Sequence, residues 1–323
     1  MTLLVNAMKK KADLASVCDE LRDRGWKPTL ADESYQHIID TGLRSKNLPL
    51  ACVMTQIALE QKPITLRGLM YQIVSAGWLP STDKEHYNRV NRLLTTLREA
   101  GIVPFNWIVD NVRETNKPSS WSGLNDFAET VKQTYRKDFW SQMSEYVHVI
   151  CEKDAIAGAL APVTREYDVS LSPLRGYVSL SFAHEIAETW IEIDKPIFAY
   201  YLGDFDASGF DLERDVRAKL ERYCKRPFEW LRIGVNDDDF DGFDLIPLEV
   251  KEKDSRSRSF IQTHGTRCAE LDALPATELR RRVREAIEDH IDADKWSRLL
   301  EVERLEKESI AAVADQWSKQ SAG

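Results

Sequence analysis

Residues 196–209 read PIFAYYLGDFDASG and decide the fold of this chain. The apolar run at 196–202 predicts a buried β-strand, and the glycine- and aspartate-rich turn after it leads into an amphipathic helix. A second apolar run, YVHVIC at 146–151, is likewise followed by an acid, Glu152, and by a helical pattern over 154–167. Strands that alternate with helices in this way are typical of βαβ units in a parallel sheet.

The same alternation continues around these two strands. A helix is expected over 181–193, and short strands are expected over 168–171 and 228–235. Two helices rich in arginine, glutamate and leucine, at about 276–291 and 294–317, close the sequence. The second half therefore predicts an α/β domain with a parallel sheet and C-terminal helices.

The first half has a helical character. Helices are expected over 49–61, over 66–77 with Thr65 as the N-cap, and over 84–100, and an extended segment follows over 102–109. Two helices, a longer helix and an extended wing, in that order, are typical of a winged helix-turn-helix.

A turn-rich linker at 114–128 separates the halves, and a helix is expected to follow it through about 144. The predicted organisation is an N-terminal helical extension (1–45), a winged-helix domain (46–118), a linker and helix (119–145), and an α/β domain with C-terminal helices (146–323).

Acidic side chains follow both central strands. Glu152 comes directly after the first strand, and Asp204 and Asp206 come directly after the second. Ligands of open α/β sheets bind outside the carboxyl ends of the strands, so the three carboxylates would converge if the strands are neighbours. Such oxygen ligands suit Mg²⁺. The alternative is that one aspartate caps the helix that begins near Ala207.

An apolar strand ending in glutamate, followed some fifty residues later by strand–Asp-x-Asp-x-x-Gly, resembles the Toprim domain of topoisomerases, primases and certain nucleases. The sequences EKDAI at 152–156, GYVSLS at 176–181 and ELDAL at 270–274 sharpen the likeness. Together they resemble the Toprim half of the topoisomerase VI A-subunit family, which includes the meiotic double-strand-break transesterase. The resemblance implies a Rossmann-like parallel sheet and a magnesium site at Glu152, Asp204 and Asp206.

The front half is similar to the same family, whose winged-helix domain carries an arginine and, four residues on, a nucleophilic tyrosine. TLRGLMY at 65–71 matches with Arg67 and Tyr71, although Met70 stands where many relatives have an aromatic residue. Residues at i and i+4 share one helix face, and a guanidinium there favours the phenolate and grips a phosphate. The alternative is that Tyr71, at helical spacing from Leu66 and Val74, belongs to the core.

The resemblance implies a homodimer in which Tyr71 attacks a phosphorus of double-stranded DNA and forms a 5′-phosphotyrosyl link. Asp204 and Asp206 would hold the Mg²⁺, and Glu152 would be a further ligand or the general acid–base. The chain has no glycine-rich ATPase motif, so a full topoisomerase would need a separate ATPase subunit. Two alternatives stay open: a hydrolytic Toprim nuclease in which Tyr71 is structural, and a non-catalytic DNA-binding subunit.

Basic residues for DNA contact are expected in two places. The helix at 84–100 carries Arg89 and Arg92, and the segment KEKDSRSRSF at 251–260 carries Lys251, Lys253, Arg256 and Arg258. An ordinary solvated charged surface is the alternative for both groups. The net charge of −9 weakens the expectation of DNA binding, because phosphate contacts supply most non-specific affinity.

The composition restricts the remaining possibilities. Five scattered cysteines without a C-x-x-C pair argue against a zinc site and a disulfide framework. No stretch approaches the roughly 18 to 20 apolar residues that a membrane helix needs, and no signal peptide is apparent. We therefore expect a cytoplasmic, nucleoid-associated protein.

Overall fold

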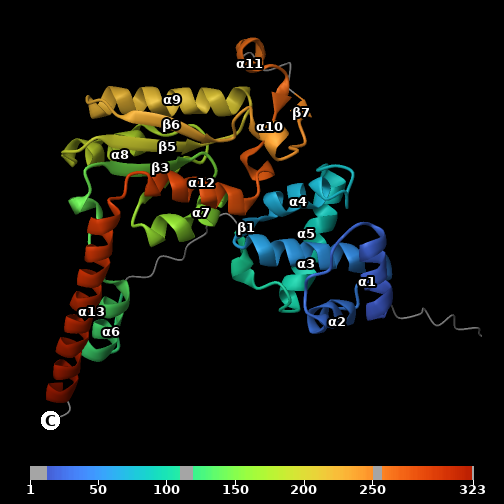
Figure 1. The fold of residues 1–323 in the computed structure, drawn as a ribbon, viewed down its shortest axis with the longest axis horizontal. Coiled ribbons are helices and arrows are strands. Elements are labelled where there is room, and N and C mark those ends of the chain that lie inside the picture. The colour runs from blue at the N-terminus through green and yellow to red at the C-terminus, as the bar shows by residue number, and fades with distance from the viewer. Residues whose placement is uncertain (1–12, 110–118, 250–256, 322–323) are drawn as a thin grey trace, which may run out of the picture.

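The computed structural model describes residues 13–109, 119–249 and 257–321 and has a mixed α/β architecture (Figure 1). Its centre is a four-stranded parallel sheet in the order β4-β3-β5-β6. The strands are β3 (Tyr146–Cys151), β4 (Ser170–Pro173), β5 (Ile197–Leu202) and β6 (Glu229–Gly234). The two strands that carry the acidic motifs, β3 and β5, are central neighbours.

Helices cover both faces of the sheet because side chains alternate along its strands. From β3, Val147 and Val149 pack with α7 (Asp154–Glu166) and α12 (Ala276–Glu288) on one face. Ile150 of the same strand packs on the other face with α8 (Leu180–Glu192) and α9 (Ala207–Cys224). The central strands β3 and β5 are mostly apolar because they are buried on both sides, whereas the edge strands β4 and β6 are more polar and more exposed.

The N-terminal helices have a core of their own. They are α1 (Leu14–Asp23), α2 (Asp32–Asp40), α3 (Leu48–Gln61), α4 (Leu66–Ser75) and α5 (Lys84–Glu99). The central helix α3 is apolar nearly all round and is buried from Leu48 to Ala58. Thr65 caps α4 as expected, since its hydroxyl accepts the Gly68 N–H at 2.8 Å.

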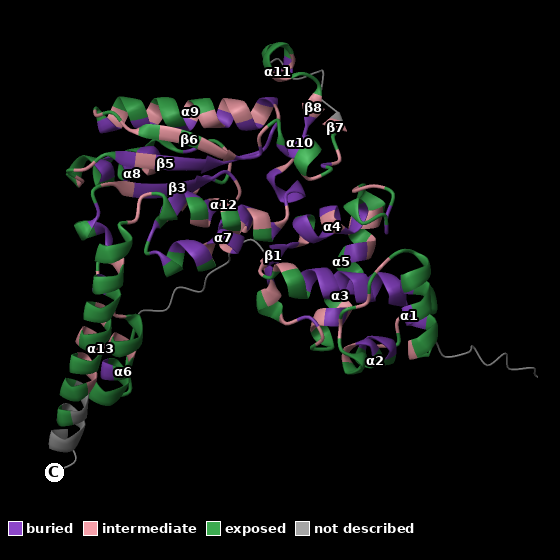
Figure 2. Cartoon of the chain, in the orientation of Figure 1, coloured by how far each residue is buried: buried purple, intermediate pink, exposed green. Residues whose placement is uncertain are grey.

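One long helix extends away from the sheet domain. The 29-residue helix α13 (Ala293–Ser321) projects from the sheet domain and packs along α6 (Leu124–Thr134); it is largely exposed (Figures 1 and 2). The other described elements are α10 (Asp239–Gly242), β1 (Ile64–Thr65), β2 (Ile108–Val109), β7 (Leu248–Glu249), α11 (Ser257–His264), β8 (Arg267–Cys268) and the 3₁₀ turns η1 (Ser45–Asn47), η2 (Phe105–Trp107), η3 (Trp140–Gln142) and η4 (Leu271–Ala273).

Most expected elements of the α/β half are confirmed, but the helix expected to reach 144 is wrong. It ends at Thr134 because Tyr135 turns to an extended conformation. The next residues bind α13 instead: the Tyr135 hydroxyl donates to Glu306, and the Lys137 backbone N–H donates to Glu303. These contacts require a chain that leaves the helix axis.

The extended segment expected over 102–109 is confirmed only at its end. Pro104 begins the 3₁₀ turn Phe105–Trp107, and only Ile108–Val109 form a strand. That strand pairs in parallel with Ile64–Thr65, so its described partner is the entry to α4 and not a second strand of a hairpin. Among the described helices, none is both long and apolar enough to cross a bilayer.

Candidate active site

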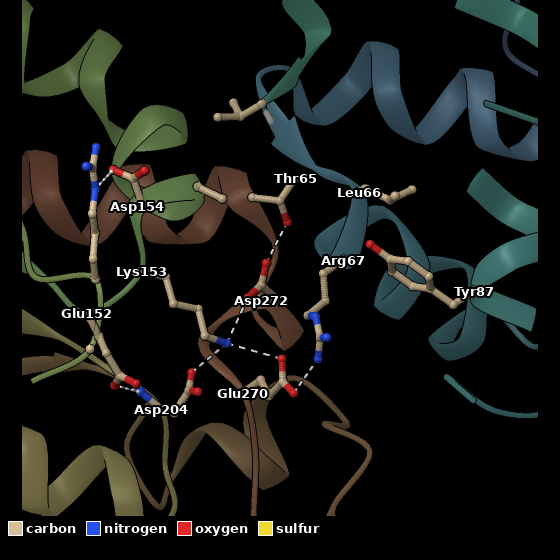
Figure 3. A pocket seen from close by; sticks show the side chains of 14 residues that line it. Thr65, Leu66, Arg67, Tyr87, Glu152, Lys153, Asp154, Asp204, Glu270 and Asp272 are labelled. Carbon is tan, nitrogen blue, oxygen red and sulfur yellow. Dashed lines mark hydrogen bonds and ion pairs between the residues drawn. The ribbon is translucent and has the colours of Figure 1, made fainter. Parts of the chain in front are cut away.

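A cavity of about 850 Å³ opens at the carboxyl ends of β3 and β5, between the sheet domain and the N-terminal helices (Figure 3). The sheet domain contributes most of its charged wall, and α4 and α5 contribute Arg67 and Tyr87. The carboxylates on the wall belong to Glu152, Asp154, Asp204, Glu270 and Asp272, and the cations to Arg67, Lys153 and Arg175. The cavity is therefore rich in charge of both signs.

Strand register brings Glu152 and Asp204 together. Cys151 pairs with Leu202, so the residues that follow them leave the sheet side by side. The Asp204 backbone N–H donates to Glu152 Oε2 at 2.9 Å, and both side chains are buried. Gly203 is required between them, because a Cβ at this position would lie 2.8 Å from Glu152 Oε2.

Burial and mutual proximity perturb this pair. Burial and the nearby Asp204 raise the pKa of Glu152 to about 7. Burial also raises the pKa of Asp204, although the neighbouring Lys153 ammonium opposes that shift. Two buried carboxyl groups whose charged forms are disfavoured are typical of a functional site and are costly in a merely structural one.

Arg232 at the end of β6 fixes the backbone of the aspartate loop. Its guanidinium donates to the carbonyls of Gly203 at 2.8 Å, Asp204 at 2.6 Å and Val235 at 2.9 Å, and it also pairs with Glu213. The planar guanidinium can hold several acceptors in one geometry. Arg232 therefore holds the backbone of Asp204 in place, although it does not itself line the cavity.

Asp206 differs from the other two predicted ligands. Its carboxylate accepts the Gly209 N–H at 2.7 Å and caps α9, which is the structural alternative considered from the sequence. Asp206 is close enough to contribute to the raised pKa of Glu152, but it is not among the described residues that line the cavity. The structure therefore brings Glu152 and Asp204 together at the cavity and does not place Asp206 among the residues that line it.

Lys153 is a site residue that the sequence reasoning missed. Its ammonium lies 2.9 Å from Asp204 Oδ1, 3.1 Å from Glu270 Oε2 and 3.0 Å from Asp272 Oδ2 (Figure 3). Burial alone would lower the pKa of Lys153, but these carboxylates raise it. The signals in the sequence are its place in EKDAI and the pair of acids in ELDAL.

A short backbone bridge delivers Glu270 and Asp272 to the cavity. Phe205 and Ala269 exchange two backbone hydrogen bonds, of 2.8 and 3.0 Å. Two residues after Ala269, the Leu271 N–H donates to Asp204 Oδ1 at 2.7 Å. The 3₁₀ turn η4 therefore lies against the aspartate loop although about 67 residues of sequence separate them.

The helix that bears Arg67 and Tyr71 is attached to this cluster. The Thr65 hydroxyl donates to Asp272 Oδ1 at 2.5 Å, and Arg67 Nη1 donates to Glu270 Oε1 at 2.5 Å. Tyr71 points into the core beneath the sheet and is only 3% exposed. Burial and the nearby Glu270 raise the pKa of Tyr71 to about 12, against the opposing effects of Arg67 and Lys153.

The residues expected to contact DNA are distributed unevenly. Arg89 is half-buried and donates to Asn47, whereas Arg92 is exposed on α5 and Arg258 is exposed in α11. Lys251, Lys253 and Arg256 lie outside the described residues.

The donor chemistry of the cavity fits Mg²⁺, which takes one or two carboxylates together with waters and a substrate phosphate. The residues that would hold it are Glu152 and Asp204, with Asp206 nearby. The Tyr201 hydroxyl is buried and has no hydrogen-bond partner among the described residues. It lies close to the Glu152 carboxylate, since a Cβ on Gly203 would contact both groups. No group of three or more described His, Cys, Asp or Glu side chains is already arranged around a metal position.

A search of protein-family models and a search of curated proteins both found no match to this chain.

Proposed function

We propose that this chain is a Mg²⁺-dependent enzyme that cleaves double-stranded DNA, with Glu152 and Asp204 at the reacting phosphate. The observation that carries the proposal is the convergence of these two buried carboxylates, from neighbouring strand ends, on a cavity of about 850 Å³. The motifs EKDAI and GDFDASG further support a relation to Toprim proteins and the topoisomerase VI A subunits.

The exposed face of α5 supports duplex DNA as the substrate. Its exposed residues Asn88, Asn91, Arg92 and Thr95 carry hydrogen-bonding groups, and the exposed acids Glu85 and Glu99 lie near the two ends of the helix. Such side chains contact phosphates and base edges when a helix lies in the major groove. Tyr87, one position away, lines the cavity, so a duplex on this face would run directly past the carboxylates.

The residues have distinct parts in the reaction. When bound, Mg²⁺ would stabilise the charge that develops on the reacting phosphate. Glu152, whose Oε2 accepts the Asp204 N–H, would be either a further ligand of the metal or the general acid–base. Arg67 and Arg175, both largely exposed on the cavity wall, offer charge-assisted hydrogen bonds to phosphate oxygens on either side of the reacting one.

Water is the nucleophile that this arrangement favours. Tyr71 is buried and is not among the described residues that line the cavity, and its pKa of about 12 disfavours the phenolate. Transesterification by Tyr71 is the second candidate, because Arg67 lies one turn before it and Lys153 and Arg67 both act to lower its pKa. A homodimer, two sites that cut both strands, and a separate ATPase subunit belong to that second candidate.

Cleavage of supercoiled plasmid in the presence of Mg²⁺ tests the proposal. We expect nicked and linear products from the wild type and none from Glu152→Gln or Asp204→Asn, while Glu185→Gln, a matched change on the exposed surface of α8, remains active. A denaturing gel separates the two nucleophiles. If water attacks, Tyr71→Phe should cleave DNA and neither protein should form a covalent adduct. If the wild type forms an adduct and Tyr71→Phe neither forms it nor cleaves, Tyr71 is the nucleophile. A wild type that neither cleaves DNA nor binds Mg²⁺ would leave the non-catalytic DNA-binding subunit.

A further inference from the structure

The ammonium of Lys153 lies in the middle of the carboxylates that line the cavity. Three different side chains, Asp204, Glu270 and Asp272, place an oxygen within 3.1 Å of Lys153 Nζ. Asp204 is also one of the two residues proposed to hold Mg²⁺. A lysine and a divalent cation cannot both occupy the same side of one carboxylate, so the two cations compete for it.

The net negative charge of the cavity wall explains why a cation is needed among these carboxylates. Its wall carries five carboxylates and three cationic groups, which leaves a net charge of −2 when all are ionised. Without any cation among them, carboxylates at this separation repel one another strongly. Lys153 supplies one positive charge from a side chain that is tethered directly after Glu152, so it is present in every folded molecule.

We propose that Lys153 is a tethered cation that holds the carboxylates together until Mg²⁺ displaces it, and so sets the concentration of Mg²⁺ at which the site becomes active. This inference rests on the proposed function. The Lys153 side chain is 25% exposed at the cavity wall, so its ammonium can move into the open volume and reach a phosphate of a bound strand. Displacement would therefore convert a competitor of the metal into a ligand for the substrate.

A role for Lys153 in positioning Asp204 and a role in competing with Mg²⁺ predict opposite changes in Mg²⁺ affinity when Lys153 is removed. If the ammonium only positions Asp204, its removal loosens a ligand and weakens Mg²⁺ binding. If the ammonium competes, its removal strengthens Mg²⁺ binding, because the ammonium no longer occupies Asp204 in a fraction of the molecules. The sign of the change therefore decides between the two roles.

Calorimetric titration of the full chain with MgCl₂, without DNA, measures that sign. We expect Lys153→Met to bind Mg²⁺ about tenfold more tightly than the wild type and to melt at a lower temperature than the wild type when Mg²⁺ is absent. Lys153→Arg keeps the charge and should not gain affinity. Lys219→Met removes a lysine that pairs with Asp215 on α9, far from the carboxylates, and should bind like the wild type.

Amine labelling of the wild type provides a measurement that needs no variant. An acylating reagent followed by mass spectrometry should modify Lys153 faster once Mg²⁺ is added, since the displaced ammonium is less engaged, while Lys219 should be unaffected. Unchanged or weaker Mg²⁺ binding by a folded Lys153→Met, or protection of Lys153 by Mg²⁺, would overturn the competition and leave the proposed function standing. Absence of Mg²⁺ binding in both the wild type and Lys153→Met would overturn the competition and the proposed function together.

Discussion

Replacing Glu152 by glutamine should stabilise the protein while it abolishes cleavage. The pKa of Glu152 is raised by burial and by Asp204 to about 7, from an ordinary value near 4.5. A carboxyl group with a raised folded-state pKa contributes stability below its unfolded pKa and loses it as the pH rises through the folded value. The wild type therefore bears an unfavourable charge above pH 7 that an isosteric amide does not bear.

The magnitude follows from the pKa difference. The difference between a pKa of about 7 in the folded protein and 4.5 in the unfolded chain corresponds to about 3 kcal/mol when the group is fully ionised, at pH 8. At pH 5 the folded wild type is protonated, and the difference falls below about 1 kcal/mol. Glutamine can still accept the Asp204 N–H that Glu152 Oε2 accepts at 2.9 Å, so the variant loses little structure.

Urea unfolding of the wild type and Glu152→Gln, without metal, at pH 8 and pH 5 measures this effect. The variant should be more stable at pH 8 by a margin that mostly disappears at pH 5, and Glu185→Gln on the exposed face of α8 should show no such dependence. Excess Mg²⁺ should reverse the order at pH 8, because only the carboxylate binds it. A variant that is equally or less stable than the wild type at pH 8 would refute the unfavourable buried charge at Glu152.

Three further predictions test other parts of the structure. Gly203→Ala places a Cβ 2.6 Å from the Tyr201 ring and should cost about 1–3 kcal/mol of unfolding free energy and eliminate plasmid cleavage, whereas Gly242→Ala, with open space around it, should do neither. His148 accepts from Trp190 Nε1 at 3.0 Å and its burial lowers its pKa to about 4, so its contribution to stability is present above pH 6.5 and is lost as the pH falls towards 4. Between pH 7 and pH 5 the wild type should lose about 2 kcal/mol more than His148→Gln in urea unfolding, and equal losses would contradict this cause. Arg92→Ala should weaken the binding of duplex DNA of any sequence, as measured by fluorescence anisotropy. It should also reduce the slope of log affinity against log salt concentration by about one, whereas Arg22→Ala on α1 should change neither.

Much of the α/β fold could be predicted because its strands are buried on both faces. The runs at 146–151 and 197–202 are apolar without alternation, and glycine or acid follows each one, so both the strands and their ends were readable. Parallel pairing of neighbouring strands then places Glu152 beside Asp204. The end of α6 could not be read in the same way, because it depends on contacts of Tyr135 and Lys137 with a helix about 170 residues later.

The three ion pairs of Lys153 could not be predicted from local spacing, for a related reason. Lys153 and Glu270 are 117 residues apart, and the backbone bridge between Phe205 and Ala269, together with the Leu271 N–H bond to Asp204, brings η4 to the aspartate loop. Local spacing carries no information about such a bridge. Tyr71 presents the same difficulty, since its spacing from Arg67 predicts a shared helix face but not whether the neighbouring domain covers it.

The attachment of α4 bears directly on which nucleophile acts. Thr65 binds Asp272, Arg67 binds Glu270, and Arg280 donates to the carbonyls of Gln61 and Pro63 just before the helix, at 2.9 and 2.8 Å. A Tyr71 that attacks DNA must first leave the core, and with α4 held at its N-terminus by these contacts, several would have to break together. Hydrolysis requires no such rearrangement, because Glu152 and Asp204 already face the cavity. If Tyr71 nevertheless forms an adduct, its formation should be faster in Thr65→Val, which frees the start of α4 from Asp272, than in the wild type; the reverse order would mean that the attachment itself builds the reactive geometry.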